Sequence, residues 1–211
     1  MTSDEWYRSA DWDADAQALF REKLSRARNQ RGFYRRVKAD AIADRHPQDA
    51  LALHEEALSE ADGDTAGIHY AMAMIHWKMG NEDSFFHFLD LALGSNGMAL
   101  GASGVMENAF ASGLLRRTER YERALELFEP WDKGARQAYG RPFSRSFAGA
   151  FGSAIILHHF RRHEEAREMA LTAIEWTEKK SGPIPSNPDI GLPPQVPDDW
   201  KELMLAIASK A

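Results

Sequence analysis

Apolar residues recur along most of the chain at the three- and four-residue spacing of amphipathic α-helices, and no long stretch alternates as a β-strand does. Asp13 and Asn81 are suited to cap helices, Pro47 suits a first helical turn, and Gly32 is expected to break or bend the chain. In the first half the pattern predicts helices at approximately 13–29, 33–42, 47–61, 64–80 and 81–93. We therefore expect an all-α fold.

The second half continues the helical pattern but contains more glycine and proline. Gly101, Gly104 and Gly113 lie inside one predicted helix, where each costs up to about 1 kcal/mol relative to alanine unless close helix contact compensates. Pro130 is expected to stop the next helix, and a polar loop is expected at 132–142. The predicted helices here are approximately 98–117, 120–130, 144–160, 162–179 and one that begins at 198.

The second helix of each predicted pair repeats one pattern. The segments are PQDALALHEEAL, EDSFFHFLDLAL, YERALELFEPWD and HEEAREMALTAI, which begin at residues 47, 82, 121 and 163. Aligned, they place Ala50, Phe85, Ala124 and Ala166 at one position, and Ala57, Ala92, Trp131 and Ala173 seven residues later. Successive units are offset by 35, 39 and 42 residues.

This pattern resembles the tetratricopeptide repeat, a helix hairpin with a period of about 34 residues. The stretches HWKMGNEDSFFHFLDLAL and RTERYERALELFEPW are the most similar, with Gly80 at the turn glycine of the family. The resemblance implies an α-α superhelix of stacked helix hairpins in a single domain. Residues 1–32 would form an N-terminal helix and cap, 33–180 the repeats, 181–197 a linker and 198–211 a last helix. The drifting period and the missing closing prolines leave an irregular helical bundle as the alternative.

In that family the first helix of each pair lines a concave groove that holds a peptide or a partner helix. The resemblance therefore implies a partner-binding groove, and mixed aromatic and cationic residues there suit a partner with apolar and acidic anchors. The alternative is that several of these residues belong to the core. The implied groove residues are Arg35, Tyr70, Met74, Trp77, Lys78, Ala109, Arg116, Arg117, Phe151, Ile155, His158 and His159.

Composition narrows the choice of function. The absence of cysteine excludes disulfides and thiol nucleophiles and fits a cytoplasmic protein. No stretch approaches the roughly 18 apolar residues of a membrane span. The net charge of −6 argues against general nucleic-acid binding.

Two clusters carry alternative functions. The segment from Arg21 to Lys38 contains eight basic residues and one acidic residue, so a nucleic-acid-binding or regulatory face is one alternative to a solvated surface. His158, His159 and His163 are the other cluster, and His159 and His163 have the four-residue spacing of helical metal ligands. A metal-binding protein or enzyme is therefore the second alternative. The leading interpretation remains a protein-binding scaffold, with no catalytic residue, metal or cofactor assigned.

Both ends of the chain carry apolar groups that need cover. Trp6 and Trp12 are expected to hold the amino-terminal segment on the first helices. The segment 181–197 contains six prolines and cannot be a helix interior. The helix after it has a stripe of Trp200, Leu203, Met204 and Ile207, which we expect to dock. Docking in its own groove would make it a competitor of the partner, and docking on a second copy would make a homodimer.

Overall fold

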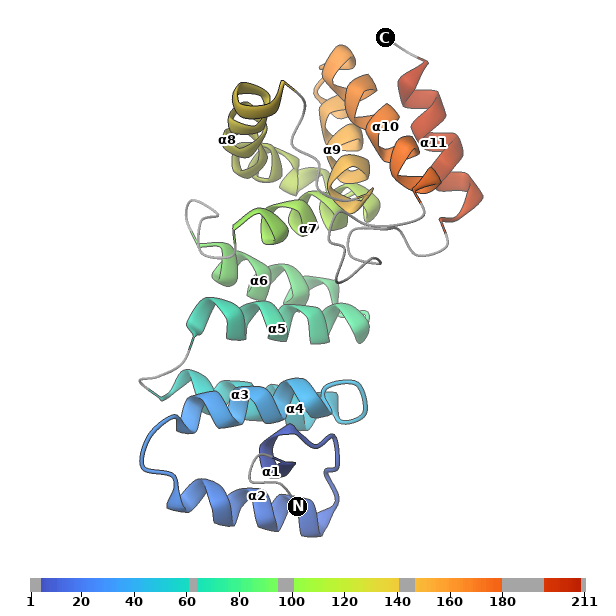
Figure 1. Ribbon diagram of the computed structural model, residues 1–211. Helices are drawn as coiled ribbons and strands as arrows, with labels where there is room; N and C mark the ends of the chain where they lie inside the picture. Colours follow the sequence, from blue (N-terminus) through green and yellow to red (C-terminus); the bar gives the residue numbers. More distant parts are fainter. Residues whose placement is uncertain (1–4, 61–63, 95–100, 141–146, 180–195, 210–211) are drawn as a thin grey trace. The chain divides into compact units, whose positions relative to one another are not determined.

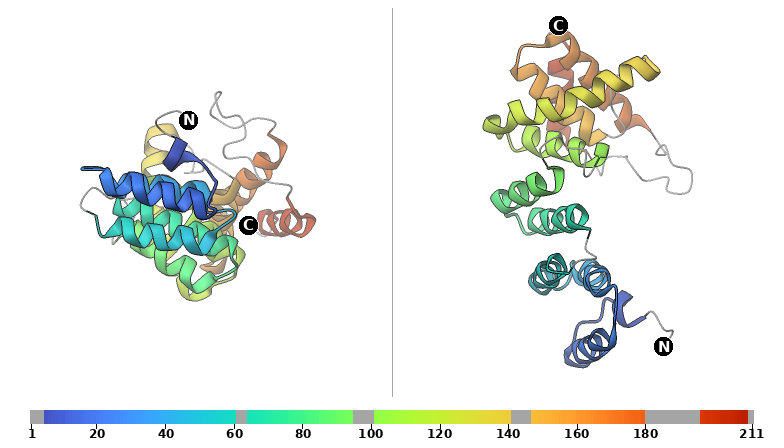
Figure 2. Two further views of the ribbon diagram at one scale, coloured as in Figure 1. Left: turned by 90° about the horizontal axis from the view of Figure 1, so that it is seen from below. Right: turned by 90° about the vertical axis from the view of Figure 1, so that its left-hand side faces the viewer.

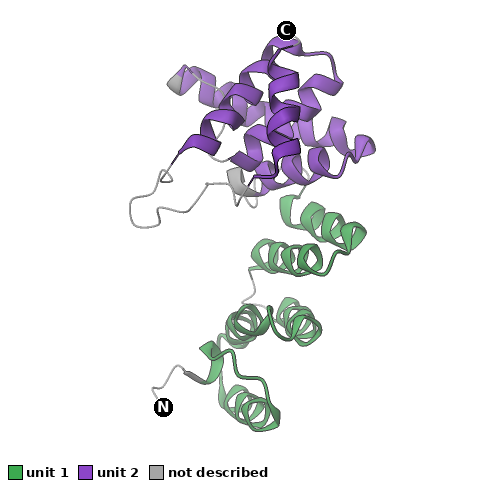
Figure 3. Ribbon diagram, turned by 90° about the vertical axis from the view of Figure 1, so that its right-hand side faces the viewer, with its two compact units in different colours: residues 1–95 green, residues 96–211 purple. Residues whose placement is uncertain are grey.

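The computed structural model describes residues 5–60, 64–94, 101–140, 147–179 and 196–209, and these form helices without any strand (Figure 1). The all-α prediction is therefore confirmed. The chain divides into two compact units, unit 1 of residues 1–95 and unit 2 of residues 96–211 (Figure 3). The helices are α1 Glu5–Arg8, α2 Ala14–Arg26, α3 Arg31–Ile42, α4 Pro47–Leu58, α5 Thr65–Lys78, α6 Glu82–Leu93, α7 Gly101–Leu114, the 3₁₀ turn η1 Thr118–Arg120, α8 Tyr121–Tyr139, α9 Phe147–His159, α10 His163–Glu178 and α11 Asp198–Ala208.

Helix starts follow the capping residues of the sequence. The Asp13 carboxylate accepts a hydrogen bond from the backbone N–H of Ala16 at 2.9 Å, and Asp64 and Asn81 cap α5 and α6 in the same way. The predicted break at Gly32 is wrong. The chain breaks just before it, where Gln30 adopts a left-handed conformation with φ of 62°, and Gly32 is buried inside α3.

Consecutive helices pack as pairs, namely α3 with α4, α5 with α6, α7 with α8 and α9 with α10. In the right-hand view of Figure 2, α3 lies beside α4 and α5 lies beside α6, and these helices are seen almost end-on. The four residues aligned from the sequence are all buried at these contacts: Ala50 and Ala166 are 0% exposed, Ala124 1% and Phe85 2%. Ala57, Ala92 and Ala173 are also buried, whereas Trp131 is half-buried. The predicted burial of Ala124 and Ala166 is confirmed.

Three of the pairs share one kind of turn. After α9, Arg161 has φ of 58°, its N–H donates to the His158 carbonyl at 3.1 Å, and the next N–H donates to the Leu157 carbonyl at 3.0 Å. Gly80 after α5 (φ of 72°) and Arg116 after α7 (φ of 51°) make the corresponding pairs of bonds. This left-handed helix end satisfies two terminal carbonyls at once. The second, third and fourth pairs therefore share one turn structure, although the offsets between successive units in the sequence differ.

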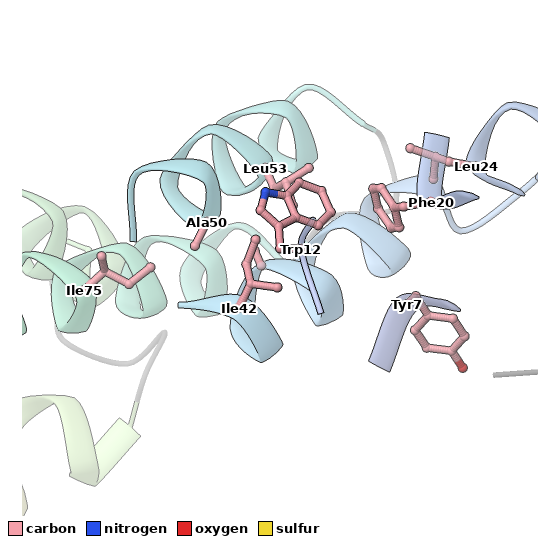
Figure 4. Close-up of a cluster of buried hydrophobic side chains, with 9 residues drawn as sticks. Tyr7, Trp12, Phe20, Leu24, Ile42, Ala50, Leu53 and Ile75 are labelled. Carbon is pink, nitrogen blue, oxygen red and sulfur yellow. The ribbon is translucent and has the colours of Figure 1, made fainter. Parts of the chain in front are cut away.

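The amino-terminal segment is stapled onto unit 1, as the sequence predicts. Trp12 is 7% exposed and packs against Phe20 in a cluster that continues through Ile42 (Figure 4). Lys38, 1% exposed, donates from Nζ to the backbone carbonyls of Ser9 at 2.7 Å and Asp11 at 2.9 Å. Burial lowers the pKa of Lys38, and the charge of Asp11 partly opposes this shift.

In unit 2, helices α7 and α9 touch through glycine. A Cβ on Gly152 would lie 2.3 Å from the Ala109 carbonyl oxygen, and one on Gly113 would lie 3.1 Å from the Gly152 Cα. The predicted compensation for interior glycines, close helix contact, is therefore present at Gly113. The predicted helix at 98–117 is shorter, at Gly101–Leu114 in the described residues.

The prediction that Pro130 ends a helix is wrong. Helix α8 runs from Tyr121 to Tyr139 with Pro130 inside it, so the predicted loop at 132–142 is helical as far as Tyr139. Proline removes one hydrogen bond to the preceding turn. Ion pairs after Pro130 stabilise the second half of α8. Arg136 pairs with Asp132 on α8 at 2.6 Å and with Glu168 on α10 at 2.8 Å.

Helix α11 docks on its own chain. It packs against α10 and α9, with Met204 and Ile207 buried at 1% and 4% exposure (Figure 1). The predicted docking is confirmed within the chain, whereas a homodimer through this helix stays a prediction. Most of the proline-rich segment lies outside the described residues. Among the described helices, none combines the length and apolar character that a membrane crossing requires.

Candidate functional site

Unit 2 has a pocket of about 510 Å³ bounded by α7, α9 and α11, which we call the unit 2 pocket. Its apolar wall comes from all three helices, and polar groups stand at the end where α7 turns toward α8. The lining residues are Gly113, Leu114, Arg116, Thr118, Tyr121, Phe151, Ile155, His158, His159, Asp199, Trp200, Leu203 and Ile207.

Arg116 is the clearest recognition group of this pocket. The left-handed turn after α7 leaves its side chain exposed at the pocket. In the described part of the chain, no carboxylate forms an ion pair with Arg116, whereas the neighbouring Arg117 pairs with Glu119 at 2.5 Å. An arginine without an internal partner can bind a carboxylate through two parallel hydrogen bonds. Of this predicted pair of arginines, only Arg116 lines the pocket.

The two adjacent histidines of α9 both line the pocket but make different contacts. The His159 ring lies edge-on to Tyr121, with ring centroids 5.1 Å apart, whereas the His158 ring lies 5.5 Å from His163. Burial raises the pKa of Tyr121, and Arg116 partly opposes this shift. Across the described ranges, no group of three or more His, Cys, Asp or Glu side chains is placed to hold a metal ion. The histidine cluster therefore gives no support to the metal-binding alternative.

Unit 1 has a smaller pocket of about 330 Å³ between α3 and α5, which we call the unit 1 pocket. Three predicted groove residues, Tyr70, Met74 and Lys78, line it. Its cations are neutralised within the chain, since Lys78 pairs with Asp44 and Arg36 pairs with Asp64 at 2.9 Å. This pocket therefore presents an apolar floor with balanced charge at its edge.

Two predicted groove residues of unit 1 pack inside the helix pairs instead. The Arg35 side chain is only 11% exposed. It pairs with Glu56 of α4 at 2.9 Å and with Glu60, just after α4, at 2.6 Å. Trp77 packs on Phe85 of α6 with ring centroids 4.9 Å apart. In unit 2, Ala109 and Phe151 are buried at 1% exposure, although Phe151 still lines its pocket.

Within the described residues, four of the eight basic residues from Arg21 to Lys38 form ion pairs within the chain. Arg31 lies 3.7 Å from Glu60, and Arg26 pairs with Glu22 at 2.8 Å. Lys38 donates hydrogen bonds to backbone carbonyls of the amino-terminal segment. Together with the ion pairs of Arg35 and Arg36, these contacts favour the interpretation as an internally paired surface. The nucleic-acid alternative gains no support from this arrangement.

Sequence reasoning missed several members of the unit 2 pocket, and each has a physical reason. Tyr121 starts the second helix of its pair, so a rule that assigns groove residues to first helices omits it. Trp200 and Leu203 were recognised as a stripe that needs cover, but their place in the pocket depends on how α11 docks. Only Arg116, Phe151, Ile155, His158 and His159 were both predicted for a groove and found here.

Comparisons with known proteins add no relative. No family model, no curated protein and no solved structure matches this chain.

Proposed function

We propose that the protein is a tetratricopeptide-like adaptor that binds a segment of another protein in the unit 2 pocket. The observation that carries this proposal is an arginine, Arg116, without an internal carboxylate partner at the mouth of a pocket that has an apolar wall and also includes Asp199 in its lining. A buried or half-buried apolar wall supplies affinity, and a charged group at its edge supplies orientation. We propose a cytoplasmic location, in keeping with the absence of cysteine.

Three features support the repeat interpretation. In the second helix of each pair the first aligned residue (Ala50, Phe85, Ala124 or Ala166) is buried, and three pairs share a left-handed turn. One pocket in each unit is lined by first helices, α3 and α5 in unit 1 and α7 and α9, together with α11, in unit 2. A further unit 2 pocket of about 880 Å³ is lined by α8 and the start of α10. First helices line the binding groove in tetratricopeptide arrays, so the first two pockets agree with that expectation.

The chemistry of the unit 2 pocket defines the segment that it fits. Ile155 and Leu203 offer apolar contact, and Trp200 offers a half-buried aromatic face. Arg116 offers charge to a carboxylate, with the Tyr121 hydroxyl and the His159 ring nearby. The proposed ligand is therefore a peptide segment that places a large apolar side chain close to a carboxylate.

A peptide-display selection on the purified full chain tests this proposal. We expect enriched peptides to combine an apolar or aromatic residue with a nearby Asp, Glu or terminal carboxylate. The variant Arg116→Gln should weaken binding of an enriched synthetic peptide by about tenfold or more, as a lost charge-assisted hydrogen bond predicts. The matched control is Arg161→Gln, an exposed arginine in the same left-handed turn of the next pair, outside the pocket.

Three outcomes would contradict the proposed role of Arg116 in binding. Equal weakening by both variants would assign the effect to general charge, and no weakening by Arg116→Gln would remove the pocket from recognition. Selection of strongly basic peptides would also contradict the proposal, because Arg116 would repel them.

A further inference from the structure

The docking of α11 suggests what kind of partner element the surface beneath it fits. Trp200 lies against three phenylalanines from α7 and α9, with ring centroids 5.8 Å from Phe110, 6.3 Å from Phe147 and 5.0 Å from Phe151. Its ring is nearly parallel to that of Phe147, at 7°. An aromatic side chain surrounded by aromatic rings is a typical anchor of a helix in a groove.

The remaining anchors of α11 follow the spacing of an amphipathic helix. Leu203, Met204 and Ile207 come three, four and seven residues after Trp200, and Met204 and Ile207 are buried on the α10 and α9 side. Leu205, on the opposite side, is 51% exposed. The surface therefore recognises one face of a helix, with an aromatic residue followed by three aliphatic ones.

Polar contacts contribute little to the attachment of α11. Within the described residues, the one side-chain hydrogen bond between α11 and the rest of unit 2 runs from Arg167 Nε to the Ala208 carbonyl at 3.2 Å. The helix has 11 residues, which is too short to be stable in water without packing. Its connection to α10 covers residues 179–197, whose sequence contains six prolines. Attachment thus depends on the apolar stripe.

We propose that the surface on α7, α9 and α10 is a receptor for amphipathic helices, and that α11 is its built-in occupant. A partner helix with an aromatic residue and aliphatic residues three, four and seven positions later would replace α11. Because Asp199, Trp200, Leu203 and Ile207 also line the unit 2 pocket, a partner helix that replaces α11 would also replace that wall of the pocket. This inference deepens the proposed function and rests on it for the location of the site.

A synthetic fluorescent peptide of residues 196–211 is the probe, and fluorescence anisotropy with the full chain is the measurement. In the unchanged protein the tethered α11 competes at an effective concentration on the order of mM, so the peptide should bind weakly. The full-chain variant Trp200→Ala should bind the unchanged peptide about tenfold more tightly or better, because its own α11 competes poorly. Leu205→Ala, on the exposed side of the same helix, is the matched control and should bind like the unchanged chain.

Two further measurements keep the test decisive if Trp200→Ala perturbs folding. Leu203→Ala is a milder variant of the half-buried part of the stripe and should strengthen peptide binding in the same direction. In the unchanged full chain, saturating peptide should accelerate hydrogen exchange in 198–208 while exchange in α9 is retained. A peptide that carries Trp200→Ala should neither bind more tightly to the Leu203→Ala chain nor accelerate exchange in 198–208 of the unchanged chain.

Unchanged exchange of α11 at saturating peptide, together with equal affinity for all chain variants, would overturn the inference. A mass that doubles with concentration and returns to that of one chain in Trp200→Ala would support it, with α11 of a second copy as the occupant. The proposed function fails separately, since it depends on Arg116, which the α11 peptide does not require. Binding of the selected peptides that does not depend on Arg116, together with accelerated exchange of α11 at saturating α11 peptide, would reject that function alone.

Discussion

Gly152→Ala tests the close contact between α7 and α9. The added Cβ would lie 2.3 Å from the Ala109 carbonyl oxygen and 2.4 Å from the Phe110 nitrogen, which are backbone atoms and cannot rotate away. Ordinary contact begins at 3.4 Å, so the two helices must separate by about 1 Å. Overpacking of this kind costs about 3 kcal/mol or more when backbone must move. The gain in helix propensity from glycine to alanine offsets about 1 kcal/mol, which leaves a net loss of about 2 kcal/mol or more.

Gly134→Ala is the matched control, because it makes the same chemical change inside α8, where an added Cβ meets nothing within 4 Å. It should stabilise the protein by about 0.5–1 kcal/mol through helix propensity alone. Urea unfolding followed by far-UV circular dichroism measures both free energies of unfolding, and hydrogen exchange in α7 and α9 locates the effect. A Gly152→Ala variant within about 0.5 kcal/mol of the unchanged chain would refute the reasoning.

Three further predictions concern stability. Ala124→Leu or Ala166→Leu should each cost about 1–3 kcal/mol in urea unfolding, because both positions are buried between paired helices; an effect within about 0.5 kcal/mol would show the repeat register to be wrong. Arg161→Gly should stabilise by about 0.5–1 kcal/mol, since glycine tolerates a φ of 58° better than arginine; a loss of stability would contradict this. Burial lowers the pKa of both His69 and His76 below 6.5, with a further contribution from a nearby histidine at His69. The unfolded chain therefore binds more protons, and stability that is complete above pH 6.5 is lost as the pH falls through the folded-state pKa values. A chain with His69→Phe and His76→Phe should lose less stability between about pH 7.5 and 5.5 than the unchanged chain, and an equal loss would assign the pH dependence to other groups.

Local signals in the sequence were sufficient for the helices and for part of their packing. Capping by Asp13 and Asn81 and burial of Ala124 and Ala166 depend on a few neighbouring residues, so a single sequence predicts them. Contacts from distant elements explain the failures. Pro130 has a local effect that favours a helix end, but ion pairs of Arg136 with α8 and α10 hold the helix beyond it.

The site was harder to predict than the fold for the same reason. Whether Arg35 and Trp77 face a groove or pack within their helix pair depends on contacts with residues elsewhere in the chain. Arg35 pairs with Glu60, and Trp77 packs on Phe85. Family-like positions alone placed both in a groove. The same family-like positions also placed Arg116 in a groove, and Arg116 does line the unit 2 pocket, where the left-handed turn after α7 holds it.

The buried ammonium of Lys38 has a practical consequence for chemical labelling. Acylating reagents need access to the amine, and here Nζ is enclosed by Trp12 and by two backbone carbonyls from the amino-terminal segment. Lys38 should therefore be labelled far more slowly than the exposed Lys23 or Lys201 of the same chain. Labelling of Lys38, read by mass spectrometry after proteolysis, would report how often the first residues leave unit 1, without any substitution in the protein.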